Sequence, residues 1–480
     1  MAATTSASVT PDAPRTDAAP ADRWLLVAGT GLAVFMAQLD TSIVAVTIQA
    51  DLGGPTSTAQ WVVLGCLVPV VALTLSAGRW LDQVGQRAAL VGSVAGFGLA
   101  SVAAGAAPTM STLIGARVAQ GAFAATLFAL LPAVTTTAVR PEVRGREMGV
   151  VTTVGPLGAV VGPAAGGLLL ERLDWGWIFF VNVPVALVVI AIARSQLPAG
   201  TRLGAPERSL ATQTLLFGAA AVSTLLALSL TAERGPGWLV LALLAVPALA
   251  AWWRTSASRP VRDLLATPGM AAPHLALAAE MGAVMVVVFL APYYLLREVG
   301  ASVSTTGLTL LAFPAAMTLL GPVGGILADR WGERRTALTG VVVLTAGMAL
   351  VAPLADTWTP TDLAWRLAVA GIGAGLFAAP DVSMAMALTP ARLLNTTGAT
   401  TSLARQLGIA LGPALATTVW ATAGYTLAGM QVAVGVATGL GALGVVALWA
   451  SPPSATTPPA TTRSGRQDRT EPSDPTRRSS

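Results

Sequence analysis

Five charged residues lie within long apolar stretches of the sequence, where a bilayer would surround them. They are Asp40, Arg117, Glu280, Asp381 and Arg405. A charged side chain in hydrocarbon costs about 2.5 kcal/mol or more, so such residues are first considered as functional ones. Because buried carboxylates can bind and release protons, the chemistry that these residues suggest is proton exchange.

Asp40 and Arg117 are expected at a similar depth in the membrane. At 1.5 Å of rise per residue, Asp40 lies about 10 Å and Arg117 about 8 Å from the outer end of its own apolar stretch. An arginine favours the ionised form of a nearby carboxyl group, whereas burial favours the protonated form. We predict that Asp40 and Arg117 couple transport to protons. A static structural ion pair is the alternative.

Glu280, Asp381 and Arg405 form a second group. The same counting along the helices places all three in the inner third of the second half of the chain. We predict that they act as secondary ionisable residues of a substrate site and tune its preference for cations. The alternative is that they are separate residues facing water or lipid headgroups.

The stretches that carry these residues are membrane helices. Of the 480 residues, 54% are hydrophobic and 11% are charged, whereas a soluble domain has about 25% charged residues. Apolar runs of about 18 or more residues recur along the chain, as in transmembrane helices. We therefore predict an all-α integral membrane protein with about fourteen spans, near 24–47, 59–78, 88–107, 112–134, 147–170, 177–196, 210–231, 237–253, 274–296, 305–328, 335–355, 364–388, 398–422 and 427–450.

The basic residues indicate the orientation of these spans. All 28 are arginines. If both termini are cytoplasmic, 22 of the 28 fall on the inner side, as the positive-inside rule requires. Only Arg172, Arg234 and Arg297 fall outside, and the other three, Arg117, Arg366 and Arg405, lie within helices. The arginines thus report topology and not a nucleic-acid surface. We expect a multi-pass protein of the cell membrane that contacts lipid, acts as a monomer and binds no nucleic acid.

One polar motif occurs twice, between the second and third spans and between the tenth and eleventh. GRWLDQVGQR begins at Gly78 and GILADRWGER at Gly325. Glycines permit a tight turn, and the aspartate can accept hydrogen bonds from a helix N-terminus. We predict a cytoplasmic latch in each half, although a generic short basic loop is the alternative. The shared positions are Gly78, Asp82, Gly85 and Arg87 in the first copy, and Gly325, Asp329, Gly332 and Arg334 in the second.

The repeat also predicts the domain organisation. Both copies occupy equivalent places if the chain holds two six-helix bundles, 24–196 and 274–450, with two additional helices in the segment 197–273. Transporters are often built in this way, with the substrate site between the repeats. The polar, proline-rich or arginine-rich tails, 1–23 and 451–480, are expected to be disordered and cytoplasmic.

Five motifs together resemble the major facilitator superfamily, and in particular its branch of fourteen-helix drug:proton antiporters. Besides the repeated loop, they are QLDTSIVAV in the first span, RVAQGAFAA in the fourth, GPLGAVVGPAAGG in the fifth and DWGWIFFVNVP at the sixth. The resemblance covers about residues 24–450. It implicates the acid of the first helix and the arginine of RVAQG in proton coupling. The fifth span carries the glycine and proline pattern of antiporters, with Gly155, Pro156, Gly162, Pro163, Gly166 and Gly167.

The first loop copy departs from the family pattern. Trp80, Gln83 and Gln86 stand where the family usually has an aliphatic residue and two basic residues. We therefore expect replacement of Asp82 to weaken the latch less than replacement of Asp329.

The function predicted from these features is proton-coupled antiport that exports small amphipathic drugs, antibiotics or secondary metabolites. Uptake by proton symport is the alternative within transport. An enzyme is disfavoured because the single Cys66 and the single His274 lie far apart in the sequence, and no cofactor or metal is expected. A sensor is also disfavoured, because it would be expected to carry a sizeable soluble domain and the sequence shows none. The partners predicted are protons and a small-molecule substrate.

Overall fold

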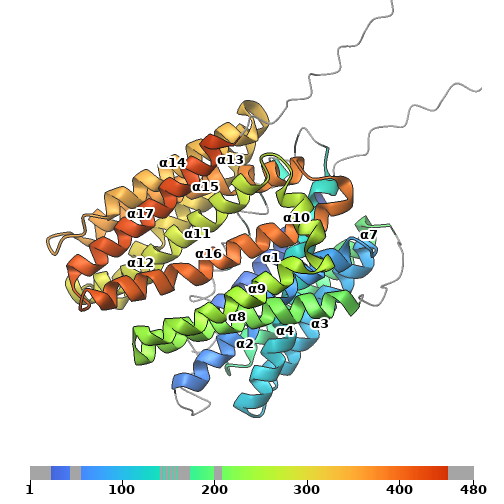
Figure 1. The fold of residues 1–480 in the computed structure, drawn as a ribbon, viewed down its shortest axis with the longest axis horizontal. Helices are drawn as coiled ribbons and strands as arrows, with labels where there is room; N and C mark the ends of the chain where they lie inside the picture. The colour runs from blue at the N-terminus through green and yellow to red at the C-terminus, as the bar shows by residue number, and fades with distance from the viewer. Residues whose placement is uncertain are drawn as a thin grey trace, which may run out of the picture.

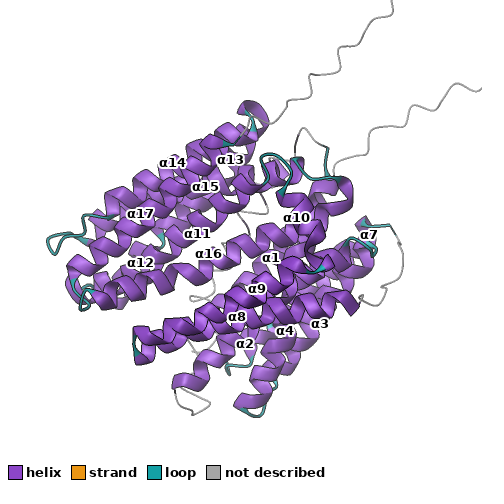
Figure 2. Cartoon of the chain, in the orientation of Figure 1, coloured by secondary structure: helices purple, strands orange, loops and turns teal. Residues whose placement is uncertain are grey.

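The structure is a computed structural model of the chain. It describes residues 23–43, 56–140, 143, 146–147, 150, 154, 158, 173–198 and 208–451. Every regular element in this part of the chain is helical, as Figure 2 shows. The prediction of an all-α protein is confirmed for these residues.

The first group of helices comes from the N-terminal part of the chain (Figure 1). Here α2 and α3 pack against α4, and α7 packs against α1 and α3. Leu26, Val94, Phe97, Leu127 and Leu130 are buried in the shared apolar core. Protein interiors are close-packed, and the van der Waals contacts of such side chains stabilise helix–helix packing in a membrane. The helices are α1 (Trp24–Ile43), α2 (Thr56–Leu81), α3 (Gln86–Gly105), α4 (Met110–Ala138), α6 (Trp177–Phe180) and α7 (Asn182–Gln196).

The second group comes from the C-terminal part. Its core is formed by α11, α14, α15 and α17, and α16 packs both on α11 and on α2 and α4 of the first group. Helix α16 therefore joins the two groups, as Figure 1 shows. The helices are α11 (Ala271–Tyr293), extended by the π-helical turn η5 (Tyr294–Glu298), α12 (Val303–Leu310), α13 (Ala312–Trp331), α14 (Glu333–Val351), α15 (Pro360–Ala387), α16 (Leu394–Thr422) and α17 (Leu427–Ala450).

A helical hairpin lies between the two groups in sequence. It consists of α8 (Arg208–Arg234), the 3-10 helix η3 (Pro236–Leu244) and α9 (Ala245–Arg254), and the short α10 (Arg259–Leu265) follows. Helix α8 packs on α2, where Arg79 Nη1 donates to Gln213 Oε1 at 2.9 Å. The hydroxyls of Thr214 and Ser76 are also hydrogen-bonded, at 2.8 Å. The hairpin is thus attached to the first group by polar contacts as well as by apolar ones.

The two copies of the loop motif lie at the same end of the molecule, which we call the motif end. Arg334, the last residue of the second copy, donates to the last carbonyls of α17, Leu448 O at 3.1 Å and Trp449 O at 2.7 Å. Arg23, just before α1, donates its backbone N–H to Ala138 O at the end of α4. Asp82 in the first copy contacts the start of α16. The start of α1 and the end of α17 therefore lie at the motif end.

Nine helices of the described part are long and apolar enough to cross a membrane. The prediction of about fourteen spans remains a prediction. Helices α1, α2 and α8 have apolar segments of 10–17 residues, and α16 has polar residues where it packs between the two groups. Most of the predicted fifth span lies outside the described residues. The nine are Gln86–Gly105, Met110–Thr135, Trp177–Gln196, Gly237–Arg254, Ala271–Glu298, Thr305–Trp331, Glu333–Val351, Pro360–Ala387 and Leu427–Ala450.

Candidate functional site

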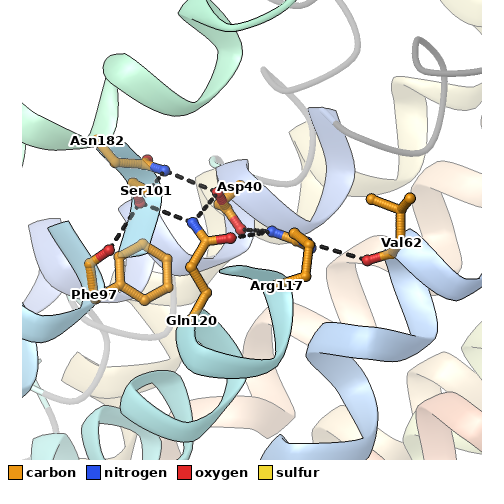
Figure 3. A network of polar contacts seen from close by, with 7 residues as sticks. All are labelled: Asp40, Val62, Phe97, Ser101, Arg117, Gln120 and Asn182. Carbon is orange, nitrogen blue, oxygen red and sulfur yellow. Dashed lines mark hydrogen bonds and ion pairs between the residues drawn. The ribbon is translucent and has the colours of Figure 1, made fainter. Parts of the chain in front are cut away.

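The structure brings Asp40 of α1 and Arg117 of α4 into direct contact (Figure 3). Arg117 Nη1 forms an ion pair with Asp40 Oδ2, and Arg117 Nε donates to the backbone carbonyl of Val62 in α2 at 3.1 Å. Both charged side chains are buried, at 1% and 0% exposure. The second contact fixes the guanidinium between α1 and α2, so the ion pair depends on three helices.

Two amides complete the coordination of the carboxylate. Gln120 Nε2 and Asn182 Nδ2 both donate to Asp40 Oδ1, at 3.1 and 2.8 Å. Both amides also donate to the Ser101 hydroxyl, at 2.8 and 3.2 Å. Figure 3 shows that Arg117 and Gln120 approach Asp40 from one helix, α4, and that Asn182 approaches it from α7. All the groups of this network are buried, so the charge on Asp40 is held by fixed protein dipoles in place of water.

The two amides were not predicted as site residues, although the sequence contains a signal for each. Gln120 lies three residues after Arg117 in RVAQGAFAA, and this spacing places both on one helix face. Asn182 lies in DWGWIFFVNVP. Ser101 has no such signal in the sequence, because a serine that bonds a helix carbonyl, here Phe97 O at 2.9 Å, is common in any membrane helix.

Close helix packing holds the network together. A Cβ atom on Gly121 of α4 would lie 2.2 Å from the carbonyl oxygen of Cys66 in α2. Only glycine permits this approach, which brings the Arg117 side of α4 against α2. The guanidinium carbon of Arg117 also lies 5.7 Å from the ring centroid of Phe179, a geometry in which the ring face stabilises the cation.

Asp40 lies at the wall of a cavity between the two helix groups. The cavity has a volume of about 180 Å³ and is also lined by Gln38 and Cys66 of the first group and by Met285 and Gln406 of the second. Pockets for drug-sized ligands have volumes of about 300–1,000 Å³. The cavity therefore has to enlarge before it can hold a molecule of that size.

Glu280, Asp381 and Arg405 also come together in the structure. They belong to α11, α15 and α16, and each charge acts electrostatically on the other two. Glu280 and Asp381 are fully buried, and none of their four carboxylate oxygens has a hydrogen-bond partner. Arg405 is partly exposed. The site in the second group thus differs from the Asp40 site, in which the carboxylate accepts three hydrogen bonds.

His274 makes a specific contact between two helices of the second group. Its Nδ1 lies 2.9 Å from Met270 O and its Nε2 lies 2.8 Å from the Thr400 hydroxyl. The imidazole therefore connects the first turn of α11 to α16.

In the first loop copy, Asp82 contacts the opposite helix group. Its Oδ1 accepts hydrogen bonds from the backbone N–H and the side-chain amide of Asn395, at 3.1 and 3.0 Å, and its Oδ2 accepts from the Thr396 hydroxyl at 2.5 Å. The carboxylate thus caps the N-terminus of α16 and is favoured there by the helix dipole. Nearby, a Cβ on Gly78 would lie 2.7 Å from Asn395 O, so glycine is required for this contact.

The second loop copy makes a weaker polar contact. Asp329 Oδ2 lies 3.5 Å from Arg146 Nε, and the Arg146 side chain is 50% exposed. Gly332 has φ of +90° between α13 and α14, which favours glycine, whereas Gly85 in the first copy has φ of −68°. Arg87 donates to Leu197 O at 3.5 Å within its own group, and Gly325 is buried in α13. The repeated sequence therefore makes different contacts in its two copies.

Burial raises the pKa of the Asp82 carboxyl, and the hydrogen bonds from Thr396 and Asn395 oppose part of this shift. A raised pKa means that Asp82 binds a proton more tightly in this contact than in water. The stabilisation that this proton gives is complete below the ordinary pKa of aspartate and is lost as the pH rises through the raised value. Burial of Asp82 should therefore be linked to proton uptake, whereas its hydrogen bonds to Thr396 and Asn395 favour the ionised carboxylate.

We expect Asp82→Asn to open the motif end more than Asp329→Asn, the reverse of the expectation from the sequence. The amide of Asn offers one acceptor oxygen for donors that bind both carboxylate oxygens of Asp82, whereas Asp329 Oδ2 and Arg146 Nε lie 3.5 Å apart and the Arg146 side chain is 50% exposed. Spin labels on the exposed Gln83 and Arg392, in a Cys66→Ala background, would report the separation by electron–electron distance measurement. Equal distance distributions in the two variants would contradict this ranking.

The predicted glycine and proline residues of the fifth span, Gly155, Pro156, Gly162, Pro163, Gly166 and Gly167, lie outside the described residues. Two neighbours of theirs are described. A Cβ on Gly158 would lie 2.3 Å from Phe35 O, and a Cβ on Gly31 would lie 3.7 Å from the Val154 side chain. At these points the segment packs closely on α1, five residues from Asp40.

Two helix groups enclose a small cavity, and a buried ion pair lies at its wall. This arrangement is typical of membrane carriers. The family model of the Major Facilitator Superfamily matches residues 28–270 and 274–477. The chain belongs to this superfamily, and it is accordingly a transporter and not an enzyme.

Two curated relatives and one solved structure are similar to the chain. The puromycin resistance protein pur8 of Streptomyces alboniger is 33% identical over 87% of this chain and 90% of its own length. The multidrug resistance protein Stp of Mycobacterium tuberculosis (strain CDC 1551 / Oshkosh) is 29% identical over 81% of this chain and 74% of its own. A crystal structure of the human organic anion transporter MFSD10 has a TM-score of 0.60 at 17% identity, over 89% of this chain and 100% of that one. This structural likeness concerns the fold alone.

Proposed function

We propose that the protein is a proton-coupled antiporter that exports small amphipathic drugs, antibiotics or secondary metabolites. The observation that carries the proposal is the buried Asp40–Arg117 pair at the wall of the cavity between the helix groups. The two resistance proteins among the relatives support export and drug-like substrates. Uptake by proton symport is the alternative.

The Asp40 network can exchange a proton for a substrate. When Asp40 is ionised, Arg117, Gln120 and Asn182 satisfy its oxygens. When a proton enters, the carboxyl loses its charge, and Arg117 loses its counter-ion in a buried site, which costs free energy. A substrate that contacts the cavity wall favours one of these two states over the other. Proton and substrate can thereby displace each other, as antiport requires.

The motif end would alternately close and open. In the structure, the Asp82 cap on α16 and the close approach of Gly78 to Asn395 join the two groups at this end. We propose that these contacts hold the cytoplasmic side closed, and that their release lets the groups separate and the cavity enlarge toward the cytoplasm. The Asp329–Arg146 contact of the second loop copy would assist.

The experiment that tests the proposal is transport in proteoliposomes with an imposed pH gradient. With protein of one orientation selected by an accessible terminal tag, a fluorescent amphipathic substrate should accumulate against its own gradient in exchange for protons. Movement of substrate in the same direction as protons would support symport instead. Substrate counterflow without a pH gradient would show that the carrier functions even if coupling is absent.

We propose separately that the protein lies in the cell membrane with both termini in the cytoplasm. The arginine distribution supports it, and the start of α1 and the end of α17 at one end agree with it. Reporter domains fused after Arg208 and Arg259 are expected to be active in the cytoplasm, and one fused after Arg234 outside. A cytoplasmic reporter at Arg234 would show that α8 and α9 do not form a membrane hairpin. We further propose that the monomer is the transporting unit.

A further inference from the structure

Two glutamine side chains line the central cavity, one from each helix group. Gln38 belongs to α1 and Gln406 to α16, and both residues are half-buried. Within the part of the chain that the structure describes, no hydrogen bond joins either side-chain amide to another residue. Each amide has two N–H donors and a carbonyl acceptor. The cavity wall therefore offers unused donors and acceptors from both helix groups.

The rest of the wall leaves these two amides as the polar groups that a ligand can use. Asp40 is the only charged residue of the wall, and its carboxylate is already bound by Arg117 and by two buried amides. The Cys66 thiol is only a weak donor. Most of the remaining wall is apolar and includes the rings of Phe97 and Phe128. The cavity thus suits an apolar molecule that carries an uncharged polar group.

The chemistry of the glutamine side chain narrows the kind of polar group. A primary amide can donate a hydrogen bond and accept one, so its best partner also carries an N–H donor beside a carbonyl acceptor. Amides, lactams and ureas have this pair of groups. An ester has the acceptor but lacks the donor. An amide that is buried without partners costs more free energy than an ester, so partners in the wall decide which of the two binds better.

We propose that Gln38 and Gln406 form an amide-recognition site, which holds the amide, lactam or urea group of an amphipathic substrate. Because one glutamine belongs to each helix group, a substrate bound by both connects α1 to α16 across the cavity. Substrate binding is thereby linked to the relative position of the two groups. This inference rests on the proposed export of amphipathic molecules and adds the chemical class of the group that is recognised.

Benzanilide and phenyl benzoate are suitable probes for this site. Each consists of two phenyl rings, joined by a secondary amide in the first compound and by an ester in the second. The two molecules have similar size and shape, and neither carries a charge. Binding of each tritiated compound to purified protein on scintillation beads, in one detergent, gives the two dissociation constants and their ratio.

We expect wild-type protein to bind benzanilide about tenfold more tightly than phenyl benzoate, because the amide gains hydrogen bonds that the ester cannot form. Gln38→Met and Gln406→Met should each reduce this preference, since each removes one partner and keeps a side chain of similar length. The double variant should prefer phenyl benzoate, because the amide then enters an apolar site without partners. Retained binding of phenyl benzoate shows that each variant is folded. Gln83→Met, at an exposed loop glutamine, is the control and should keep the wild-type ratio.

The outcomes separate this inference from the proposed function. The amide-recognition site is refuted if wild-type protein does not bind benzanilide more tightly than phenyl benzoate, or if either single variant keeps the wild-type ratio. Export driven by the pH gradient can persist in both cases, and the proposed antiport then stands. An amide preference that needs both glutamines, in protein that does not exchange substrate for protons in proteoliposomes, would instead support the site and refute the antiport.

Discussion

Replacing Asp40 with Asn is expected to abolish proton-driven export and reduce it to the level of protein-free liposomes. The Asn side chain cannot take up and release a proton, and its amide nitrogen would face one of the donors that now bind the carboxylate, Arg117, Gln120 or Asn182. Substrate counterflow without a pH gradient should persist, because the neutral amide resembles the protonated acid. The measurement is transport with and without the gradient in the same proteoliposomes.

The control for this substitution is Asp174→Asn. It makes the same chemical change in the same half of the chain, at an exposed residue, and should leave driven transport intact. If Asp40→Asn still couples transport to the pH gradient, Asp40 is not the proton site, and the Glu280–Asp381 pair becomes the candidate. Loss of counterflow together with driven transport would indicate a structural defect and not a loss of coupling.

The sequence predicts that Asp40 and Arg117 lie at a similar depth, because hydropathy and helix rise together indicate the depth of each. Charged residues are rare in the apolar stretches, and helix rise gives the depth of each one. Depth does not determine rotation about the helix axis, so the sequence could not show which side chains complete the site. Gln120 and Asn182 are uncharged and do not stand out by hydropathy, although their hydrogen bonds orient the carboxylate.

The loop motif shows a different limit of sequence reasoning. The shared offsets in the two copies predict two related connections, and the copies do join α2 to α3 and α13 to α14, but partners are set by tertiary contacts. Asp82 meets Asn395, which is 313 positions away in the chain, and its partners are backbone and side-chain groups of a helix N-terminus. From the sequence, basic partners within the loop are expected, whereas Asp82 binds groups of the other helix group. The ranking of the two copies stays a prediction.

Helix α16 shows that the mean hydropathy of a helix does not by itself decide whether the helix can lie in a membrane. Helix α16 runs from Leu394 to Thr422, which is long enough to cross a bilayer, yet it is not among the nine apolar spans of the described part. Three of its polar residues contact the first helix group. Asn395 and Thr396 bind Asp82, and Ser402 donates to Phe128 O at 2.8 Å. A helix between the two groups can be polar because protein, not lipid, surrounds it.

Removing Arg117 is expected to have the second large effect. Arg117→Ala leaves Asp40 buried with its charge uncompensated, and breaking a buried ion pair in this way costs about 3–5 kcal/mol. The variant should therefore lose proton-driven export and unfold at a lower temperature in detergent. Arg297→Ala, which removes an exposed arginine from the rings of Tyr293 and Trp420, is the control and should change the melting temperature much less.

The double variant Asp40→Asn, Arg117→Ala separates stability from coupling. Removing both charges leaves no unpaired buried charge, so the double variant should recover most of the melting temperature that Arg117→Ala loses. Export driven by the pH gradient should stay absent, since no carboxyl remains to carry the proton. If the double variant regains both stability and driven export, the pair is a structural ion pair. If the double variant regains stability alone, Arg117 acts through the charge of Asp40. A neutral residue 40 then no longer needs Arg117 for folding, but it still cannot couple export to protons.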